Sequence, residues 1–93
     1  MKPETRFKAK VVKMLQEIGC WHVKTQQVAV RGTPDILGCR NGKFFALELK
    51  ADKESKTSAL QEFELSCIAS NNGIALVVYP ENLQESLEIV RGL

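Results

Sequence analysis

The chain has 93 residues, of which 44% are hydrophobic and 26% are charged, and these proportions exclude a disordered or collagen-like chain and fit one folded domain. The net charge of +2 hides an asymmetry, because residues 1–56 carry twelve Lys/Arg against six Asp/Glu, whereas residues 57–93 carry one Arg against five Glu. A basic half that contains some carboxylates is typical of a protein that binds a polyanion close to metal-binding acids. An uneven spread of ordinary surface charge explains the same numbers.

The first predicted element is an amphipathic helix over residues 3–18, bounded by a proline and a glycine. On a helical wheel, Glu4 falls beside the apolar stripe and Glu17 falls on the polar side. We therefore expect Glu4 to face the body of the protein and Glu17 to face water. The apolar stripe consists of Phe7, Val11, Met14, Leu15 and Ile18.

Three strand segments are expected next. Residues 20–30 are rich in Trp, Val and Thr and form one strand or two short ones. After a turn at residues 31–34, residues 35–40 and 43–51 form a hairpin, because the Asn41-Gly42 pair between them favours a tight two-residue turn. Alternation along the second hairpin strand predicts one face with Phe45, Leu47 and Leu49 and another with Phe44, Ala46, Glu48 and Lys50.

The second half of the chain predicts a helix, a strand and a last helix. A polar loop over residues 52–58 leads to a helix that starts at Ser58, with Gln61 as a candidate capping-box partner. The apolar run over residues 74–79 is typical of a buried strand and is too short to span a bilayer. The last helix carries Leu83, Leu87 and Val90.

The predicted element order is α-β-β-β-α-β-α. A helix between the third and fourth strands favours a parallel crossover, so we predict an α/β fold with a small mixed sheet flanked by helices. All of residues 1–93 belong to this single domain. The N-terminal segment is charged and lacks the apolar core of a secretory signal, so we expect a cytoplasmic protein with no membrane contact.

Cysteine and aromatic residues are expected to be structural. The three cysteines are odd in number and form no C-x-x-C pair, so neither a disulfide framework nor a zinc site is indicated. We expect all three to be small buried residues. The large aromatic residues are expected in the core rather than as surfaces on which bases stack. The cysteines are Cys20, Cys39 and Cys67, and the aromatic residues are Trp21, Phe44 and Phe45.

The strongest chemical signal is the triplet Glu48-Leu49-Lys50. An acid followed two positions later by Lys also occurs at Glu54-Ser55-Lys56, but that triplet lies in a polar loop where charges are solvated. The first triplet lies in an otherwise apolar strand. A charged pair is costly to bury there unless it is paired or binds a ligand.

Asp35 gives an independent second signal. It opens the strand that the hairpin turn pairs with the Glu48 strand, so the two carboxylates should be neighbours at the end away from the turn. Adjacent carboxylates repel unless a cation or a proton lies between them, and hard oxygen ligands suit Mg²⁺ or Mn²⁺. Lys50, on the same face, can orient a water or stabilise a phosphate, as in metal-assisted phosphodiester hydrolysis. A surface salt-bridge cluster of the same three residues is the alternative.

The pairing of Pro34-Asp35 with Glu48-Leu49-Lys50 resembles the motif of the PD-(D/E)XK nuclease superfamily. The resemblance covers nearly the whole chain and implies a restriction-endonuclease-like core. The closer likeness is to the VRR-NUC (virus-type replication-repair nuclease) family, through Gly32-Thr33-Pro34-Asp35, Ala46-Leu47-Glu48-Leu49-Lys50 and Leu60-Gln61.

The resemblance implies a role for each site residue. It implies metal ligation by Asp35, Glu48 and the main-chain carbonyl of Leu49, and assistance of the attacking water by Lys50. It adds the helical acid Glu4 to the catalytic set. It also adds Gln61, for which the capping-box role is about equally supported by the sequence.

The resemblance further implies a substrate and an assembly. Stand-alone members are similar to phage-encoded nucleases that form homodimers and act on branched DNA, including four-way (Holliday) junctions. This implies a Mg²⁺-dependent DNA endonuclease able to use Mn²⁺, working in the host cytoplasm if a phage encodes it. A non-catalytic DNA-binding module with the same basic face is the alternative. Candidate phosphate contacts are Arg6, Lys10, Lys24, Arg31, Lys53 and Lys56.

Overall fold

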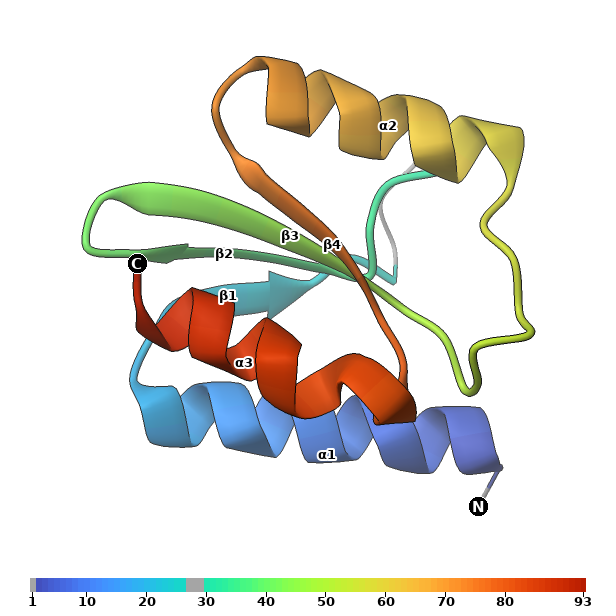
Figure 1. Cartoon of the computed structure of the whole chain (residues 1–93), viewed down its shortest axis with the longest axis horizontal. Helices are drawn as coiled ribbons and strands as arrows, with labels where there is room; N and C mark the ends of the chain where they lie inside the picture. Colours follow the sequence, from blue (N-terminus) through green and yellow to red (C-terminus); the bar gives the residue numbers. More distant parts are fainter. Residues whose placement is uncertain (1, 27–29) are drawn as a thin grey trace.

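The computed structural model describes residues 2–26 and 30–93, and its elements follow the predicted order (Figure 1). The fold class is therefore α/β, as predicted. Residues 27–29, where the sequence allows a second short strand, lie outside the described residues. The elements are α1 (Pro3–Ile18), β1 (Trp21–Lys24), β2 (Ile36–Arg40), β3 (Lys43–Leu49), α2 (Ala59–Ser70), β4 (Ile74–Val78), the 3-10 turn η1 (Pro80–Asn82) and α3 (Leu83–Arg91).

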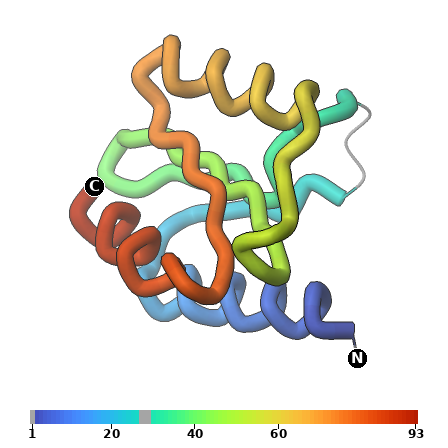
Figure 2. Tube along the Cα trace, turned by 45° about the vertical axis from the view of Figure 1, so that its right-hand side comes forward, coloured from blue at the N-terminus to red at the C-terminus, as the bar shows by residue number. Residues whose placement is uncertain are grey.

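The four strands form one mixed sheet in the order β1-β2-β3-β4. The β1–β2 and β2–β3 pairs are antiparallel, whereas β3 and β4 are parallel and are connected through α2, as predicted. Helix α2 lies on one side of the sheet, and α1 and α3 lie together on the other side (Figures 1 and 2). Among the helices that the structure describes, none has the length and apolar character needed to cross a membrane.

The turn of the β2–β3 hairpin sets the register on which the site depends. Asn41 and Gly42 have positive φ angles of 51° and 77°, as a tight two-residue hairpin turn requires. The resulting register pairs Ile36 with Leu47 at the far end of the hairpin. The residue before Ile36 and the residue after Leu47 are the two acids of the predicted site, so the turn brings them to the same end of the sheet.

Three strands are one or two residues shorter than predicted. Strand β2 begins at Ile36 rather than at Asp35, and β3 ends at Leu49 rather than at Ala51. On the β2 side, the Leu49 N–H donates to the Asp35 side chain, which ends the β2–β3 main-chain ladder there. Strand β4 likewise ends before Tyr79, because the Tyr79 N–H donates to the side chain of Asn82.

The hydrophobic core lies between the sheet and the layer formed by α1 and α3. As the alternation predicted, Phe45, Leu47 and Leu49 all point into it. Helix α2 contributes nothing to this core, since none of its 12 residues is buried. The remaining core residues are Phe7, Val11, Leu15, Ile36, Val78, Leu83, Leu87 and Val90.

Several residues expected to be buried are exposed. Trp21 is 63% exposed and Phe44 is 41% exposed, so the core prediction is wrong for both and right for Phe45. Cys39 and Cys67 are also exposed, contrary to expectation, and Cys20 is half-buried. For Trp21 on β1 and Cys39 on β2 the reason is tertiary: α2 packs mainly on β4 and β3, which leaves much of the β1–β2 part of that face uncovered.

Gly38 provides a stability test of the core. A Cβ on Gly38 would lie 2.2 Å from Cζ of Phe45, and Phe45 is fully buried. We expect Gly38→Ala to lower the free energy of unfolding by about 1–3 kcal/mol, because the ring must shift within a packed core. Chemical denaturation measures this change.

Gly92→Ala is the matched control. Its Cβ would lie 3.4 Å from the nearest atom, and its φ of −83° suits any residue. We expect its unfolding free energy to change by less than about 0.5 kcal/mol. Equal losses in the two variants would contradict the overpacking argument.

Candidate active site

Four segments of the chain bring the predicted site residues to one end of the sheet. These segments are the first two turns of α1, the turn before β2, the end of β3 with the loop after it, and the first turn of α2. Together they enclose a cavity of about 260 Å³. The cavity is lined by Glu4, Lys8, Asp35, Glu48, Leu49, Lys50, Ala51, Ser55 and Gln61.

The Asp35 carboxylate is fixed against the end of β3. Its Oδ2 accepts a hydrogen bond of 2.8 Å from the Leu49 N–H. Its Oδ1 lies 3.4 Å from Nζ of Lys8 on α1. One oxygen of Asp35 therefore has a main-chain donor and the other has a cationic partner.

The turn that carries Asp35 is held from two sides. On the β1 side, the Thr25 hydroxyl donates to the Pro34 carbonyl and the Thr25 N–H donates to the Asp35 carbonyl over 3.0 Å. On the α2 side, Gly32 has a φ of +84°, and a Cβ there would lie 2.6 Å from the carbonyl oxygen of Leu60. The turn therefore requires glycine both for its backbone conformation and for its approach to α2.

Glu48 is a buried acid at the centre of the site, with only 3% of its surface exposed. Its Oε2 accepts a hydrogen bond of 2.7 Å from Gln61 Nε2 and lies 3.4 Å from Nζ of Lys50. Its Oε1 is buried and has no hydrogen-bond partner among the residues that the structure describes. Such an oxygen is costly unless a cation or a proton satisfies it.

The surroundings of Glu48 disfavour its charged form. Burial, and then the negative charge of Asp35, raise the pKa of Glu48 above its usual value, and Lys50 only partly offsets them. Asp35 and Glu48 line the same cavity, so the hairpin brings the two carboxylates to one place, as the sequence predicted. A divalent cation placed between them would reverse this balance.

Gln61 makes both sets of contacts that the sequence left open. Its N–H donates to Ser58 Oγ over 3.1 Å, and its Oε1 accepts from the Ser58 N–H over 2.8 Å, which completes a capping box. The same Oε1 also accepts from Lys50 Nζ over 3.2 Å, while Nε2 donates to Glu48. One side chain therefore connects the start of α2 to the site.

Lys8 is the site residue that the sequence reasoning missed. Its Nζ lies 3.4 Å from Asp35 Oδ1 and 3.7 Å from Glu4 Oε1. A signal was present in the sequence, because Lys8 is one turn after Glu4 and falls beside Leu15 of the apolar stripe on a helical wheel.

The two acids of α1 lie as the wheel predicted. Glu4 lines the site cavity, although its side chain is 65% exposed and stands at the rim, paired with Lys8. Glu17 is exposed and is not part of the cavity lining. The position of Glu4 is therefore compatible with the catalytic role that the resemblance implies, whereas Glu17 faces water, as predicted.

Four of the predicted phosphate contacts flank the site. Lys24 lines a small neighbouring cavity together with Lys8 and Asp35. Lys53 and Lys56 are exposed on the loop whose Ala51 and Ser55 line the site cavity, and Arg31 is exposed in the turn before Asp35.

The other two candidates, Arg6 and Lys10, are exposed on α1 and line neither cavity. On a helical wheel both fall on the side of α1 opposite Glu4 and Lys8. Any phosphate that they contact therefore lies away from the carboxylates.

The oxygen atoms at the site fit a hard divalent cation. The described part of the chain contains no group of three or more His, Cys, Asp or Glu side chains placed to hold a metal. The predicted set falls below that number because it has two such side chains, Asp35 and Glu48, and one main-chain carbonyl, that of Leu49. Mg²⁺ in proteins is usually bound by a few protein oxygens, and water molecules complete its coordination shell. The unpartnered Oε1 of Glu48 is the observation that favours a cation here.

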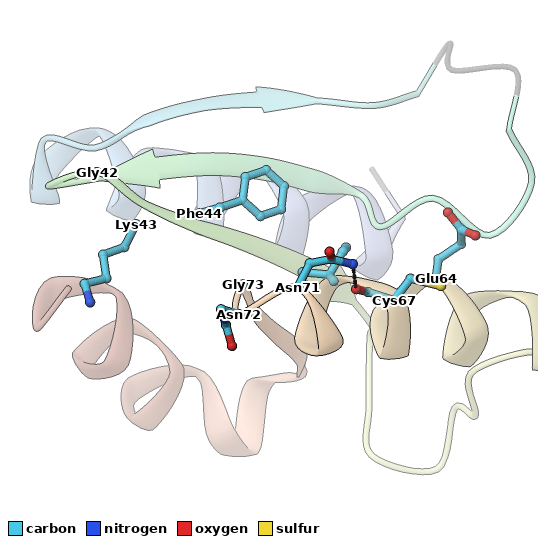
Figure 3. Close-up of a pocket in the computed structure, with 9 residues that line it drawn as sticks. Gly42, Lys43, Phe44, Glu64, Cys67, Asn71, Asn72 and Gly73 are labelled. Carbon is cyan, nitrogen blue, oxygen red and sulfur yellow. Dashed lines mark hydrogen bonds between the residues drawn. The ribbon is translucent and has the colours of Figure 1, made fainter.

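A larger cavity of about 600 Å³ lies elsewhere, between the hairpin turn and the C-terminal half of α2 (Figure 3). It contains none of the predicted site residues, and its single acid, Glu64, has no second carboxylate beside it in the lining. Its size alone therefore does not make it the chemical centre. It is lined by Gly42, Lys43, Phe44, Glu64, Cys67, Ile68, Asn71, Asn72 and Gly73.

Comparison with known proteins identifies the fold. No protein-family model matches the chain, and no curated protein matches it either. Among solved structures, one named "VRR_NUC domain" aligns with a TM-score of 0.83 at 20% sequence identity, covering 95% of this chain and 97% of that chain. The chain therefore has the fold of a VRR_NUC domain, the family that its motifs resemble.

The raised pKa of Glu48 predicts a pH effect on stability. Between the ordinary value of 4.5 and the raised one, the folded protein holds a proton that the unfolded chain has lost. Stability without metal should therefore fall as the pH rises through this interval. We expect wild type to lose stability relative to Glu48→Gln as the pH is raised from 4.5 to 8 in EDTA, measured by denaturation.

Magnesium should oppose this loss at neutral pH in wild type and have little effect in Glu48→Gln, since a cation binds the charged form. A stability difference between the two proteins that does not change with pH would show that Glu48 titrates in the folded protein as it does in the unfolded chain.

Proposed function

We propose that this chain, which has the fold of a VRR_NUC domain, is a Mg²⁺-dependent DNA endonuclease in which Mn²⁺ can replace Mg²⁺. The observation that carries the proposal is the buried, unpartnered Oε1 of Glu48 beside Asp35, in a cavity that also contains Lys50. A protein that only binds DNA gains nothing from two adjacent carboxylates next to a phosphate, because like charges repel. The name of the similar solved structure supports a nuclease.

Each residue of the site has a separate role in the proposed reaction. Asp35, Glu48 and the Leu49 carbonyl would hold the divalent cation, which when bound lowers the pKa of a water and stabilises charge on the phosphate. Lys50 lies 3.4 Å from Glu48. Its ammonium orients the attacking water and stabilises the negative charge that develops on the phosphate oxygens. Gln61 holds Lys50 and Glu48 in place, because its amide accepts from one and donates to the other.

The proposed substrate is branched DNA, with four-way junctions as its main form. Phosphate contacts by Lys24, Arg31, Lys53 and Lys56 would position the backbone beside the carboxylates without reading sequence. The proposal assigns none of the described loops to base recognition. The shape of the DNA would therefore decide what is cut.

The proposal includes a homodimer, because a four-way junction requires two cuts and a two-fold dimer offers two sites. The proposed contact uses α2 rather than α3. Leu83, Leu87 and Val90 of α3 are already buried in the core, whereas Leu60 and Phe63 of α2 are 51% and 61% exposed. Lys43 and Glu64 lie in the adjoining cavity and carry opposite charges, which suits a two-fold contact.

The enzyme assay uses a labelled four-way junction. We expect cleavage by wild type with Mg²⁺ and none with EDTA. Lys50→Met should reduce the cleavage rate by about 100-fold or more while most DNA binding remains, since Lys50 is one charge among many. Glu4→Ala should also cut more slowly, and Glu17→Ala is the matched control that should cut like wild type.

Two outcomes would contradict parts of the proposal. If the folded protein binds the junction but cuts it with neither Mg²⁺ nor Mn²⁺, the chain is a non-catalytic DNA-binding module and the proposed activity is wrong. Displacement of the junction by unlabelled linear duplex at equal strand concentration would refute the preference for branched DNA.

The dimer is tested by light scattering at micromolar concentration. We expect a mass of about twice the 10.4 kDa of one chain. Phe63→Lys should give monomers with an unchanged fold, because a charge at an exposed apolar contact blocks association rather than folding. Ile89→Lys is the matched control, since Ile89 is 44% exposed on α3. A wild-type mass near 10.4 kDa would reject the dimer.

A further inference from the structure

Lys8 is an internal cation at the predicted metal site. Its ammonium lies between Asp35 Oδ1 at 3.4 Å and Glu4 Oε1 at 3.7 Å. The side chains of Lys8 and Asp35 are each 26% exposed, whereas that of Glu4 is 65% exposed. The contact with Asp35 is therefore the better shielded of the two, and salt screens it less.

The hydrogen bonds of the two acids show which oxygens remain for an external cation. Asp35 Oδ2 accepts the Leu49 N–H, and Glu48 Oε2 accepts the Gln61 amide. The remaining oxygens are Glu48 Oε1, which is unpartnered, and Asp35 Oδ1, which faces Lys8. Asp35 Oδ1 is the oxygen of Asp35 that accepts no main-chain N–H. A divalent cation that binds both acids through this oxygen would come close to the Lys8 ammonium, and the two positive charges would repel each other.

The small neighbouring cavity that includes Lys24 has a volume of only about 10 Å³ and leaves no room for an ammonium group. Lys8 also lines the site cavity of about 260 Å³, where its ammonium has room to turn. Its flexible four-carbon stem allows the ammonium to turn toward a new anion. A DNA phosphate that enters the site cavity is such an anion, and its negative charge can replace that of Asp35 as the partner of Lys8.

We propose that Lys8 competes with the divalent cation for Asp35 in the free protein and moves to the DNA phosphate in the complex. This inference rests on the proposed function. In the free protein, Lys8 neutralises Asp35 and keeps metal affinity low. In the complex, the phosphate takes the ammonium and releases Asp35 Oδ1 to the metal. Because linkage is reciprocal, the metal must raise DNA affinity by the same factor by which DNA raises metal affinity.

The first test measures Mn²⁺ binding without DNA by calorimetry. We expect Lys8→Met, which keeps the length of the side chain and removes its charge, to bind Mn²⁺ at least tenfold more tightly than wild type. Lys13→Met is the matched control, because Lys13 is exposed on the opposite side of α1 and its loss changes the net charge equally. We expect its affinity to stay within about twofold of wild type, since exposed distant charges are screened. A thermal melt checks folding, and Lys8→Gln replaces Lys8→Met if the latter is unfolded.

The second test measures coupling between metal and DNA. Junction affinity is measured by fluorescence anisotropy with and without Mn²⁺, in a Lys50→Met background so that the DNA stays intact. Mn²⁺ should raise DNA affinity by a larger factor when Lys8 is present than in Lys8→Met, and Lys13→Met should keep the larger factor.

The outcomes separate this inference from the proposed function. If Lys8→Met binds Mn²⁺ no more tightly than wild type while Asp35→Asn abolishes binding, the competition is refuted and the metal site stands. Equal coupling with and without Lys8 refutes the transfer to phosphate. If neither wild type nor Lys8→Met binds Mn²⁺, the metal-dependent function fails and this inference fails with it.

Discussion

The hydrogen bond from the Leu49 N–H to the Asp35 carboxylate is the contact on which the site depends. It ends the β2–β3 ladder with a side chain in place of a main-chain acceptor, and so fixes a carboxylate beside the last residues of β3. Glu48 is then held next to Asp35 by the strand itself. The tight turn at Asn41-Gly42 makes this arrangement unavoidable, because a change of register by one residue would turn Glu48 to the opposite face of the sheet.

The charges around this contact are nearly but not fully balanced. Three acids and two lysines line the site cavity, which leaves one excess negative charge. The buried Oε1 of Glu48 has no partner among the described residues, so the arrangement costs stability that a packed apolar pair would not cost. Such a cost at one end of an otherwise well-packed sheet is typical of functional sites, and it is the reason why we place the proposed chemistry there.

Helix α2 has two functions that its sequence alone does not separate. Its first turn places Gln61 against Glu48 of β3 and packs the Leu60 carbonyl closely against Gly32 in the turn before β2, so the helix contacts both sides of the candidate site. Further along the helix, Leu65 and Ile68 are half-buried against the sheet, whereas Phe63 and Cys67 are exposed. The exposed apolar side chains of α2 form the surface that we propose for the contact with a second subunit.

The sequence by itself determined the elements and the parallel crossover, because these follow from hydrophobic periodicity. It also determined the approach of Asp35 to Glu48, because the tight Asn41-Gly42 turn allows only one register of the hairpin. Local pattern also gave the capping box of Gln61. Only the tertiary structure decided which residues are exposed, as Trp21 and Cys67 show, because an apolar side chain is buried only where another element covers it. It also decided that Lys8 meets Asp35, 27 positions away along the chain. That contact depends on how α1 packs across the sheet, and no short-range pattern encodes such packing.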